Sequence, residues 1–214
     1  MFEPKQAQPP SPTVAGGAPP GRRILLSETF DNPAVGAIIS GADDRALGVS
    51  GYENREFVVR KVTPEVAQSY SRRVPGSYGD AALAIDVRLA ATTEGRFSIL
   101  QCRRTRTGGY EAVVIPDIGG VAIGRRDGED ETVLAVLQTS AVRPGTNTNR
   151  IELACLGSEI TIRINGVHVV TVEDETYHQG ELAFGVGNLA PEGPAEAWFD
   201  NLVVSAPVEP AIAP

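Results

Sequence analysis

The chain has 214 residues, with 19 lysines and arginines against 27 aspartates and glutamates, which gives a formal net charge of −8 at pH 7. This length suits one domain with a sizeable core, and all-β sandwiches often reach it. The acidic balance disfavours nucleic acid and anionic membranes as partners, because both repel negative charge. The apolar runs are only strand-sized, so the sequence predicts no transmembrane helix.

The two ends of the chain differ in composition from its middle. The N-terminal stretch MFEPKQAQPPSPTVAGGAPPG is rich in Pro, Gly and Ala and lacks the apolar region of a signal peptide. Such a tract cannot bury enough apolar surface to fold. We therefore expect a disordered linker over 1–22, a folded domain over 23–207 and a flexible tail over 208–214. A linker of this kind leads us to expect another domain, an anchor or a removed signal before it; the alternative is a native disordered tail.

Between the two ends, about a dozen short segments alternate apolar and polar residues and are rich in Val, Ile and Thr. Gly, Asn and Asp separate them, as expected of strands joined by tight turns. Residues 63–71 form the single candidate for a helix, and it is short. The pattern predicts an all-β antiparallel sandwich or barrel. The expected strands are 23–30, 56–62, 81–90, 96–104, 110–115, 120–126, 132–137, 150–155, 159–164, 167–172, 181–187 and 197–204.

One turn is specified by its residue types. Asn165-Gly166 lies between the strands expected over 159–164 and 167–172. Asn and Gly both tolerate the positive φ that a type I′ turn requires at its two central positions. The sequence therefore predicts a two-residue hairpin there.

The chain has two cysteines, Cys102 and Cys155, and both fall in expected strands. Composition alone leaves two alternatives. They are inert buried thiols, or they form one disulfide, which implies an oxidising compartment. With no further thiol and no cluster of histidines nearby, nothing supports a zinc site.

A series of short motifs runs through the second half of the chain in a fixed order. A strand leads into Cys-x-Gly, the next strand ends in Asn-Gly, a D-x-x-Y-x-x-G segment follows, and the last strand contains Phe-Asp-Asn. These motifs, with a Cys-Arg pair upstream and LSETFDNP near the start, resemble bacterial concanavalin A-like lectin/glucanase jelly rolls. The resemblance covers about 80–206 and implies a two-sheet β-sandwich. The matching residues are Cys102, Arg103, Asn149, Cys155, Gly157, Asn165, Gly166, Asp174, Tyr177, Gly180, Phe199, Asp200 and Asn201.

The resemblance also bears on the cysteines and on location. Such domains often carry this pair of cysteines together, which implies a disulfide between Cys102 and Cys155, and we expect it to join neighbouring strands. They commonly follow a linker on bacterial lipoproteins or lie on the outer side of membrane-anchored serine/threonine kinases. The resemblance therefore implies an extracellular or cell-surface location.

Glucanases of this fold carry three carboxylates in the pattern E-x-D-x-E, which puts all three on one face of a strand. The acidic runs DGEDE (127–131) and VEDE (172–175) lack that pattern, and both are expected at turns. Acidic runs of this kind are usually solvated. The sequence thus argues against a glucanase of this type.

A second set of residues resembles the branch of the superfamily that contains 3-keto-disaccharide hydrolases and laminin G-like domains. These are Arg103, the run Gly109-Tyr110-Glu111, and Asp117. If the turn centres near Thr107, Arg103 and Glu111 are cross-strand partners, and such a pair stabilises a sheet by about 0.2–1 kcal/mol. The alternative is a sugar site. There Glu111 would be the acid or base and Arg103 would hold a hydroxyl or carbonyl, with Tyr110 and Asp117 as further ligand-binding candidates.

Other candidates for a site are few. Trp198 is the single tryptophan, and we expect it to pack on an outer strand rather than to stack on a sugar. No cofactor or metal site is predicted. Calcium stays an open alternative, because lectin-like jelly rolls bind it through loop Asp and carbonyl groups, but the sequence shows no dense oxygen-ligand motif.

The sequence therefore favours a non-catalytic exported module that binds a glycan or another cell-surface component. One alternative is a glycoside hydrolase of the 3-keto-disaccharide hydrolase type acting through Glu111. The other is a structural or assembly domain that makes protein–protein contacts. Nucleic acid is not expected as a partner.

Overall fold

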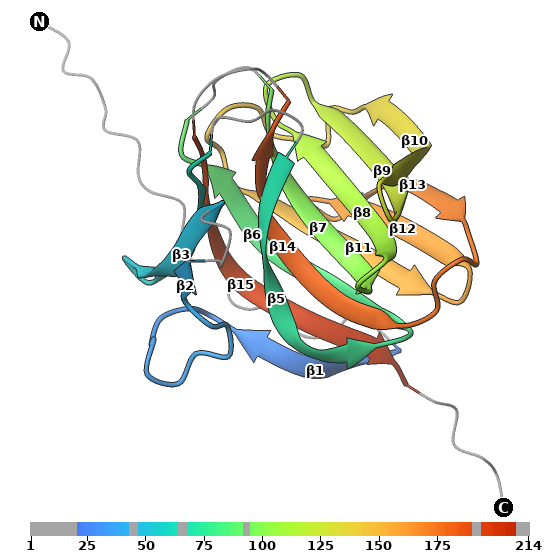
Figure 1. The fold of residues 1–214 in the computed structure, drawn as a ribbon, viewed down its shortest axis with the longest axis horizontal. Helices are drawn as coiled ribbons and strands as arrows, with labels where there is room; N and C mark the ends of the chain where they lie inside the picture. Colours follow the sequence, from blue (N-terminus) through green and yellow to red (C-terminus); the bar gives the residue numbers. More distant parts are fainter. Residues whose placement is uncertain (1–20, 43–46, 64–67, 92–94, 190–193, 209–214) are drawn as a thin grey trace, which may run out of the picture.

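A computed structural model describes residues 21–42, 47–63, 68–91, 95–189 and 194–208. The described ranges hold fifteen strands and no helix, so they contain no helix long and apolar enough to cross a membrane. The strands form two antiparallel sheets that face each other (Figure 1). The fold is an all-β sandwich, as the sequence predicts. The expected linker over 1–22 and tail over 208–214 lie almost entirely outside the described residues.

The larger sheet has nine strands. Its order is β13-β12-β11-β6-β15-β4-β3-β2, and β1 also pairs with β15, beyond the end of β4. The first strand and the last are therefore neighbours, which closes the domain (Figure 1). The bounds are β1 Arg22–Glu28, β2 Gly41–Ala42, β3 Gly48–Glu53, β4 Glu56–Lys61, β6 Ala81–Leu89, β11 Asn149–Leu156, β12 Glu159–Ile164, β13 Val167–Glu173 and β15 Ala195–Pro207.

The smaller sheet has six strands in the order β10-β9-β8-β7-β14-β5. Strands β7 to β10 form a meander of consecutive hairpins, whereas β14 inserts between β7 and β5 from far along the chain. The bounds are β5 Gln68–Tyr78, β7 Arg96–Arg104, β8 Gly108–Ile115, β9 Gly120–Asp127, β10 Asp130–Gln138 and β14 Gly180–Asn188.

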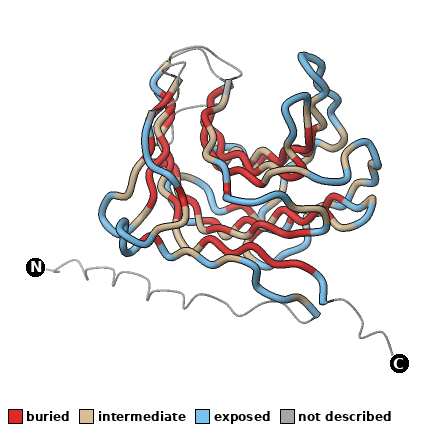
Figure 2. The backbone as a smooth tube through the Cα atoms, turned by 60° about the horizontal axis from the view of Figure 1, so that its bottom comes forward, coloured by how far each residue is buried: buried red, intermediate tan, exposed pale blue. Residues whose placement is uncertain are grey.

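The core lies between the two sheets, and buried residues recur along the strands that face each other (Figure 2). The alternation of each strand directs their apolar side chains inward. Aromatic rings connect the layers: Phe184 on β14 lies with its ring centroid 4.8 Å from Phe199 on β15 and 5.9 Å from Phe57 on β4. All three side chains are fully buried. Aromatic rings of this size contribute much of the apolar area that stabilises a sandwich.

All twelve expected strands are present, and three further strands, β2, β3 and β5, were missed. The single helix candidate, 63–71, is not helical where it is described, because residues 68–71 begin strand β5; residues 64–67 lie outside the described ranges. Strand β5 forms one edge of its sheet and contains Pro75 and Gly76 at a register shift opposite β14. Proline is tolerated at edges and bulges, but it removes the pattern by which a strand is recognised.

The expected hairpin at Asn165-Gly166 is confirmed. Ile164 pairs with Val167, and the two residues between them have φ values of 53° and 82°. The Asn165 side chain also accepts a hydrogen bond from the Arg150 amide and donates to the Ala141 carbonyl. The turn therefore anchors the hairpin to neighbouring segments as well as reversing the chain.

Candidate functional site

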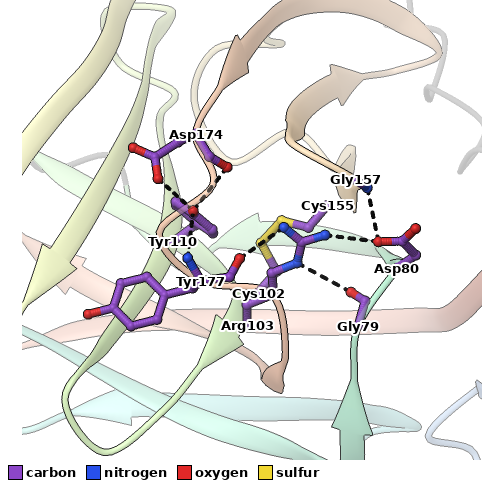
Figure 3. The surroundings of a disulfide bond; sticks show 9 residues. All are labelled: Gly79, Asp80, Cys102, Arg103, Tyr110, Cys155, Gly157, Asp174 and Tyr177. Atoms are coloured by element: carbon purple, nitrogen blue, oxygen red, sulfur yellow. Dashed lines mark hydrogen bonds and ion pairs between the residues drawn. A yellow bond between two sulfur atoms is a disulfide. The ribbon is translucent and has the colours of Figure 1, made fainter.

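Cys102 on β7 and Cys155 on β11 form a disulfide, with their Cα atoms 6.6 Å apart (Figure 3). The implied pairing is therefore confirmed. The expectation that it joins neighbouring strands is wrong, because β7 and β11 belong to different sheets. The bond links the two layers directly, and both residues are fully buried.

Arg103 lies inside the protein next to this disulfide (Figure 3). Its side chain is only 2% exposed. The guanidinium donates hydrogen bonds to the carbonyls of Gly79 and Tyr177, at 3.4 and 3.0 Å, and to the Asp80 carboxylate at 3.0 Å. Asp80 also accepts a hydrogen bond from the Gly157 amide at 2.9 Å. Arg103 therefore ties together three connecting segments at one end of the sandwich.

The expected cross-strand pair of Arg103 and Glu111 is wrong. In the β7–β8 pairing, Gln101 lies opposite Glu111 and Cys102 opposite Tyr110, so the turn centres on Arg106. A bulge in β7 also moves Arg103 away from the expected position. Gln101 lies opposite Ala183 on β14 and Arg104 lies opposite Glu181, so β7 has one residue more than β14 over this length. Arg103 has a φ of 49° at this bulge. A bulge changes which face the following residues occupy, so Arg103 turns inward and Arg104 faces outward.

Tyr110 also belongs to the interior. Its ring packs against Tyr177, and its hydroxyl donates to the Asp174 carboxylate at 2.7 Å and accepts from the Tyr177 amide at 3.0 Å (Figure 3). Burial raises the pKa of Tyr110, and the bond to Asp174 adds to this rise. Burial alone would raise the pKa of Asp174, but hydrogen bonds from Tyr110, Thr176 and Arg125 outweigh it and lower the pKa to about 2. The two groups form a structural pair.

Asp117 is exposed on the turn between β8 and β9, where its carboxylate accepts a hydrogen bond from the Gly95 amide at 3.1 Å. Glu111 is six residues earlier, in the middle of β8. At about 3.3 Å per residue, the strand from Glu111 to Ile115 spans roughly 13 Å, and Asp117 lies beyond that end. The four residues proposed from the sequence therefore occupy three separate places, and Glu111 is the one whose side chain lies on the outer face of the six-stranded sheet.

The Glu111 carboxylate is the centre of a polar chain across that outer face. Glu111 is only 7% exposed. It accepts hydrogen bonds from the Gln101 amide at 3.3 Å and from Arg126 at 3.5 Å. This polar chain of side chains continues on both sides of Glu111, because Ser71 donates to Gln101 at 3.2 Å and Arg126 donates to Glu131 at 3.4 Å. It therefore runs from β5 to β10.

Small residues leave room around this chain. The strand register places Gly124 opposite Glu111, Ala183 opposite Gln101, and Gly185 opposite Ser71. A Cβ at Gly185 would lie 2.2 Å from the Tyr70 backbone oxygen, so no larger residue fits there. Short side chains on either side of longer ones hollow the surface of a sheet.

Two hollows are present on this face, and both are lined by Arg104. The larger, of about 680 Å³, runs along β5 and is also lined by Arg73 and Glu181. The smaller, of about 130 Å³, lies at the β7–β8 hairpin and is also lined by Glu111 and Arg126. We refer to the two together as the outer groove.

Arg104 is the charged residue shared by both parts of the outer groove. Its nearest carboxylate oxygen, on Glu181, is 4.0 Å away, which is beyond hydrogen-bond distance. Burial and the positive charge of Arg73 lower the pKa of Arg104, and Glu181 and Glu111 partly oppose this. Hydrogen-bond donors and acceptors therefore lie side by side along the outer groove. Arg104, Gln101 and Arg126 were not proposed from the sequence.

No known protein-family model matches the sequence, and no curated protein matches it either. Solved structures do match. Carbohydrate binding module CBM66 from Bacillus subtilis superposes with a TM-score of 0.61 at 16% identity, covering 74% of this chain and 92% of that one. A lichenase derived from a mouse hindgut metagenome gives 0.59 at 14% identity, covering 86% and 99%. The kappa-carrageenase of Zobellia galactanivorans gives 0.62 at 9% identity, covering 92% and 100%.

The chain has the concanavalin A-like jelly-roll fold. At these identities the likeness shows the fold alone, and function must be argued from the groove. Neither acidic run places three carboxylates on one strand of this groove. DGEDE spans the turn between β9 and β10, and VEDE spans the end of β13. Within the described ranges, no three His, Cys, Asp or Glu side chains are grouped to hold a metal.

Trp198 lies on the other sheet of the jelly roll, on the interior strand β15 rather than on an outer strand. The guanidinium carbons of Arg60 and Arg88 lie 5.7 and 5.0 Å from its ring centroid. Arg60 is in turn paired with Glu53 and Glu196, so these charges are held in place. The ring is half-buried and packed against these two guanidinium groups, as expected.

Asp200 of the Phe-Asp-Asn motif lies on the same outer face as Trp198, whereas Phe199 points into the core. Asp200 accepts a hydrogen bond from the Asn201 amide, and a register shift follows it in β15. Burial raises the pKa of Asp200 to about 6, and the carboxylates of Asp86, Glu56 and Asp31 add to the rise while the Asn201 amide opposes it. The motif therefore shapes a bulge in the middle of β15, and the group with the raised pKa is the Asp200 carboxylate at that bulge.

Proposed function

We propose that the protein is a glycan-binding module whose ligand lies in the outer groove, with Glu111 at its centre. The observation that carries this proposal is the nearly buried Glu111 carboxylate on the floor of a hollow, held by Gln101 and Arg126. Binding sites combine a concave surface with a few fixed polar groups. A carboxylate accepts hydrogen bonds from sugar hydroxyls, while the amide and guanidinium groups donate to them.

Two further observations support an exported glycan-binding role. Three proteins with this fold are named as a carbohydrate binding module, a lichenase and a kappa-carrageenase. The Cys102–Cys155 disulfide fits an oxidising compartment. An extracellular or cell-surface location is therefore part of the proposal.

The groove favours binding over hydrolysis. Glycosidases place two carboxyl groups about 5–9.5 Å apart, on either side of the bond that they cleave. The nearest carboxylate oxygens of Glu111 and Glu131 are at most about 7 Å apart, because one nitrogen of Arg126 lies 3.5 Å from the first and 3.4 Å from the second. The guanidinium, however, occupies the space that the glycosidic bond would need. A hydrolase acting through Glu111 and Glu131 is the second candidate.

A glycan array with three forms of the domain tests the proposal: wild type, Glu111→Gln, and the control Glu159→Gln. Glu159 is an exposed residue of β12 on the other sheet. We expect Glu111→Gln to weaken binding about tenfold or more, as loss of a charge-assisted hydrogen bond does, and the control to bind normally. Silence across the array would overturn the proposal and favour a protein-contact role.

The same bound glycans are then tested for release of reducing ends. We expect none from wild type. Release that Glu111→Gln abolishes would replace the binding module with the hydrolase.

A further inference from the structure

We propose that the glycan is anionic, carrying carboxylate or sulfate groups, and that Arg104 binds those groups. This inference rests on the proposed function and names the ligand class of the same groove. The first observation behind it is charge. Seven charged residues line the outer groove, five arginines and two glutamates, so its net charge is +3 in a chain whose net charge is −8. They are Arg72, Arg73, Arg104, Arg106, Arg126, Glu111 and Glu181.

Three of these arginines, Arg72, Arg73 and Arg126, already have hydrogen-bond partners. Arg106 is exposed on the β7–β8 turn, so Arg104 is the partly buried arginine of the groove that lacks such a partner among the described residues. Arg73 is paired with Glu181 at 3.1 Å, and Arg72 donates to the Tyr70 hydroxyl and the Ile39 carbonyl. Arg104 has only the 4.0 Å approach of Glu181, although its side chain is just 33% exposed. Among the described residues, no acceptor lies within hydrogen-bond distance of its guanidinium. Its donors are therefore available to a ligand in a partly desolvated place, where a charge-assisted bond is strong.

The geometry suits a planar anion. The guanidinium presents its N–H groups as a rigid fork that matches two oxygens of a carboxylate or a sulfate. Because Arg104 lines both hollows, an anionic group beside it would also lie near Arg73, while hydroxyls of the same sugar reach toward Glu111. A concave surface of one sign also concentrates counter-charged ligands.

The groove offers no aromatic ring for stacking. Tyr70 and Tyr110 are the aromatic residues that line it, and they are 3% and 1% exposed. Neutral sugars and single-stranded nucleic acids both depend largely on flat rings on which to stack. Recognition in this groove must instead use charge and hydrogen bonds, which favours an acidic polysaccharide over either of those ligands.

Matched pairs of polysaccharides test the inference by isothermal titration calorimetry. The first pair is polygalacturonate and its full methyl ester; the second is a sulfated galactan and the same polymer after desulfation. We expect the acidic member of at least one pair to bind about tenfold or more tightly than its neutral partner. The pair that shows the difference identifies carboxylate or sulfate as the bound group. Added salt should weaken this binding, because the anion lies in a groove open to solvent.

Three substitutions assign the effect to Arg104. Arg104→Gln should lose the preference for the acidic member, and Arg104→Lys, which keeps the charge but lacks the fork, should retain part of it. The control Arg163→Gln removes an exposed arginine from β12 on the other sheet and should bind as wild type.

The outcomes separate the inference from the proposed function. Equal affinity for acidic and neutral members, with Glu111→Gln still weakening both, would overturn the inference and leave glycan binding intact. Binding to no glycan at all would overturn the proposed function. Binding of a single-stranded oligonucleotide as tightly as of any glycan, lost in Arg104→Gln, would overturn the assignment to a glycan.

Discussion

Replacing Arg103 with methionine separates a structural arginine from a binding one. The side chain is 2% exposed and donates to two backbone carbonyls and one carboxylate. Asp80 is 53% exposed, so water replaces its ion pair at a cost of at most about 1 kcal/mol. The carbonyls of Gly79 and Tyr177 belong to half-buried residues that water partly reaches, so each unmade bond costs about 1–1.5 kcal/mol, the lower part of the usual range. Because methionine keeps part of the apolar contact, we expect a total loss of about 2–4 kcal/mol.

Chemical and thermal unfolding with the disulfide intact measure this loss. For a domain of this size, the expected change lowers the melting temperature by about 5–15 °C. The control is Asp80→Asn, which removes only the exposed partner and should cost less than about 1 kcal/mol. Glycan binding, measured well below the melting temperature, should be unchanged in both variants. An Arg103→Met protein that is as stable as wild type but has lost its ligand would refute the reasoning and return Arg103 to the site.

Three further predictions concern the rest of the fold. Replacing Cys102 and Cys155 together by serine opens a loop with a sequence separation of 53 and should lower the unfolding free energy by about 2–4 kcal/mol, as followed by urea titration. The folded pKa of Asp200, about 6, is above its ordinary value of 3.8, so its ionised form destabilises the fold at pH 7 and this effect disappears as the pH falls from about 6 to about 4. Asp200→Asn should therefore raise the melting temperature at pH 7 but not at pH 4, and an equal rise at both would contradict the shift. Trp198→Ala should lower stability without weakening glycan binding in the same array, because the ring is packed between two arginines.

Most of the fold could be predicted because its strands carry a period-two pattern. The alternation of apolar and polar residues is clearest where one face of the strand is fully buried, as in β6. It is lost in strands whose packing does not need an apolar side chain at every second position. Strand β3 reads GVSGYE, and its two glycines remove the alternation. Strand β5 carries Arg72, Arg73, Pro75 and Gly76, and its position at the sheet edge releases it from the pattern of a central strand. The missed strands are thus the ones whose residue types are set by neighbouring turns or by a position at the sheet edge.

The candidate site was less predictable, because it depends on the register between strands. Glu111 could be proposed from its residue type and its resemblance to a known motif. Its partners could not, since Gln101 and Arg126 reach it across two strand pairings whose offsets are set by hairpin turns. The glycines gave a signal that could have been used. A glycine inside a strand often marks a place where the surface must stay low, and Gly124 and Gly185 lie beside the polar chain.

A single bulge explains why the motif pointed one residue away from the groove. In an unbroken strand, residues 101 and 103 share a face, so Gln101 and Arg103 would both have lined the outer surface. The bulge inserts one residue, and Gln101 and Arg104 share that face instead. Because positions 103 and 104 are both arginine, either register supplies a guanidinium to the groove and another to the interior. The residue types at the site are therefore the same in both readings, and only the strand geometry decides which arginine lines the groove and which ties the connecting segments together.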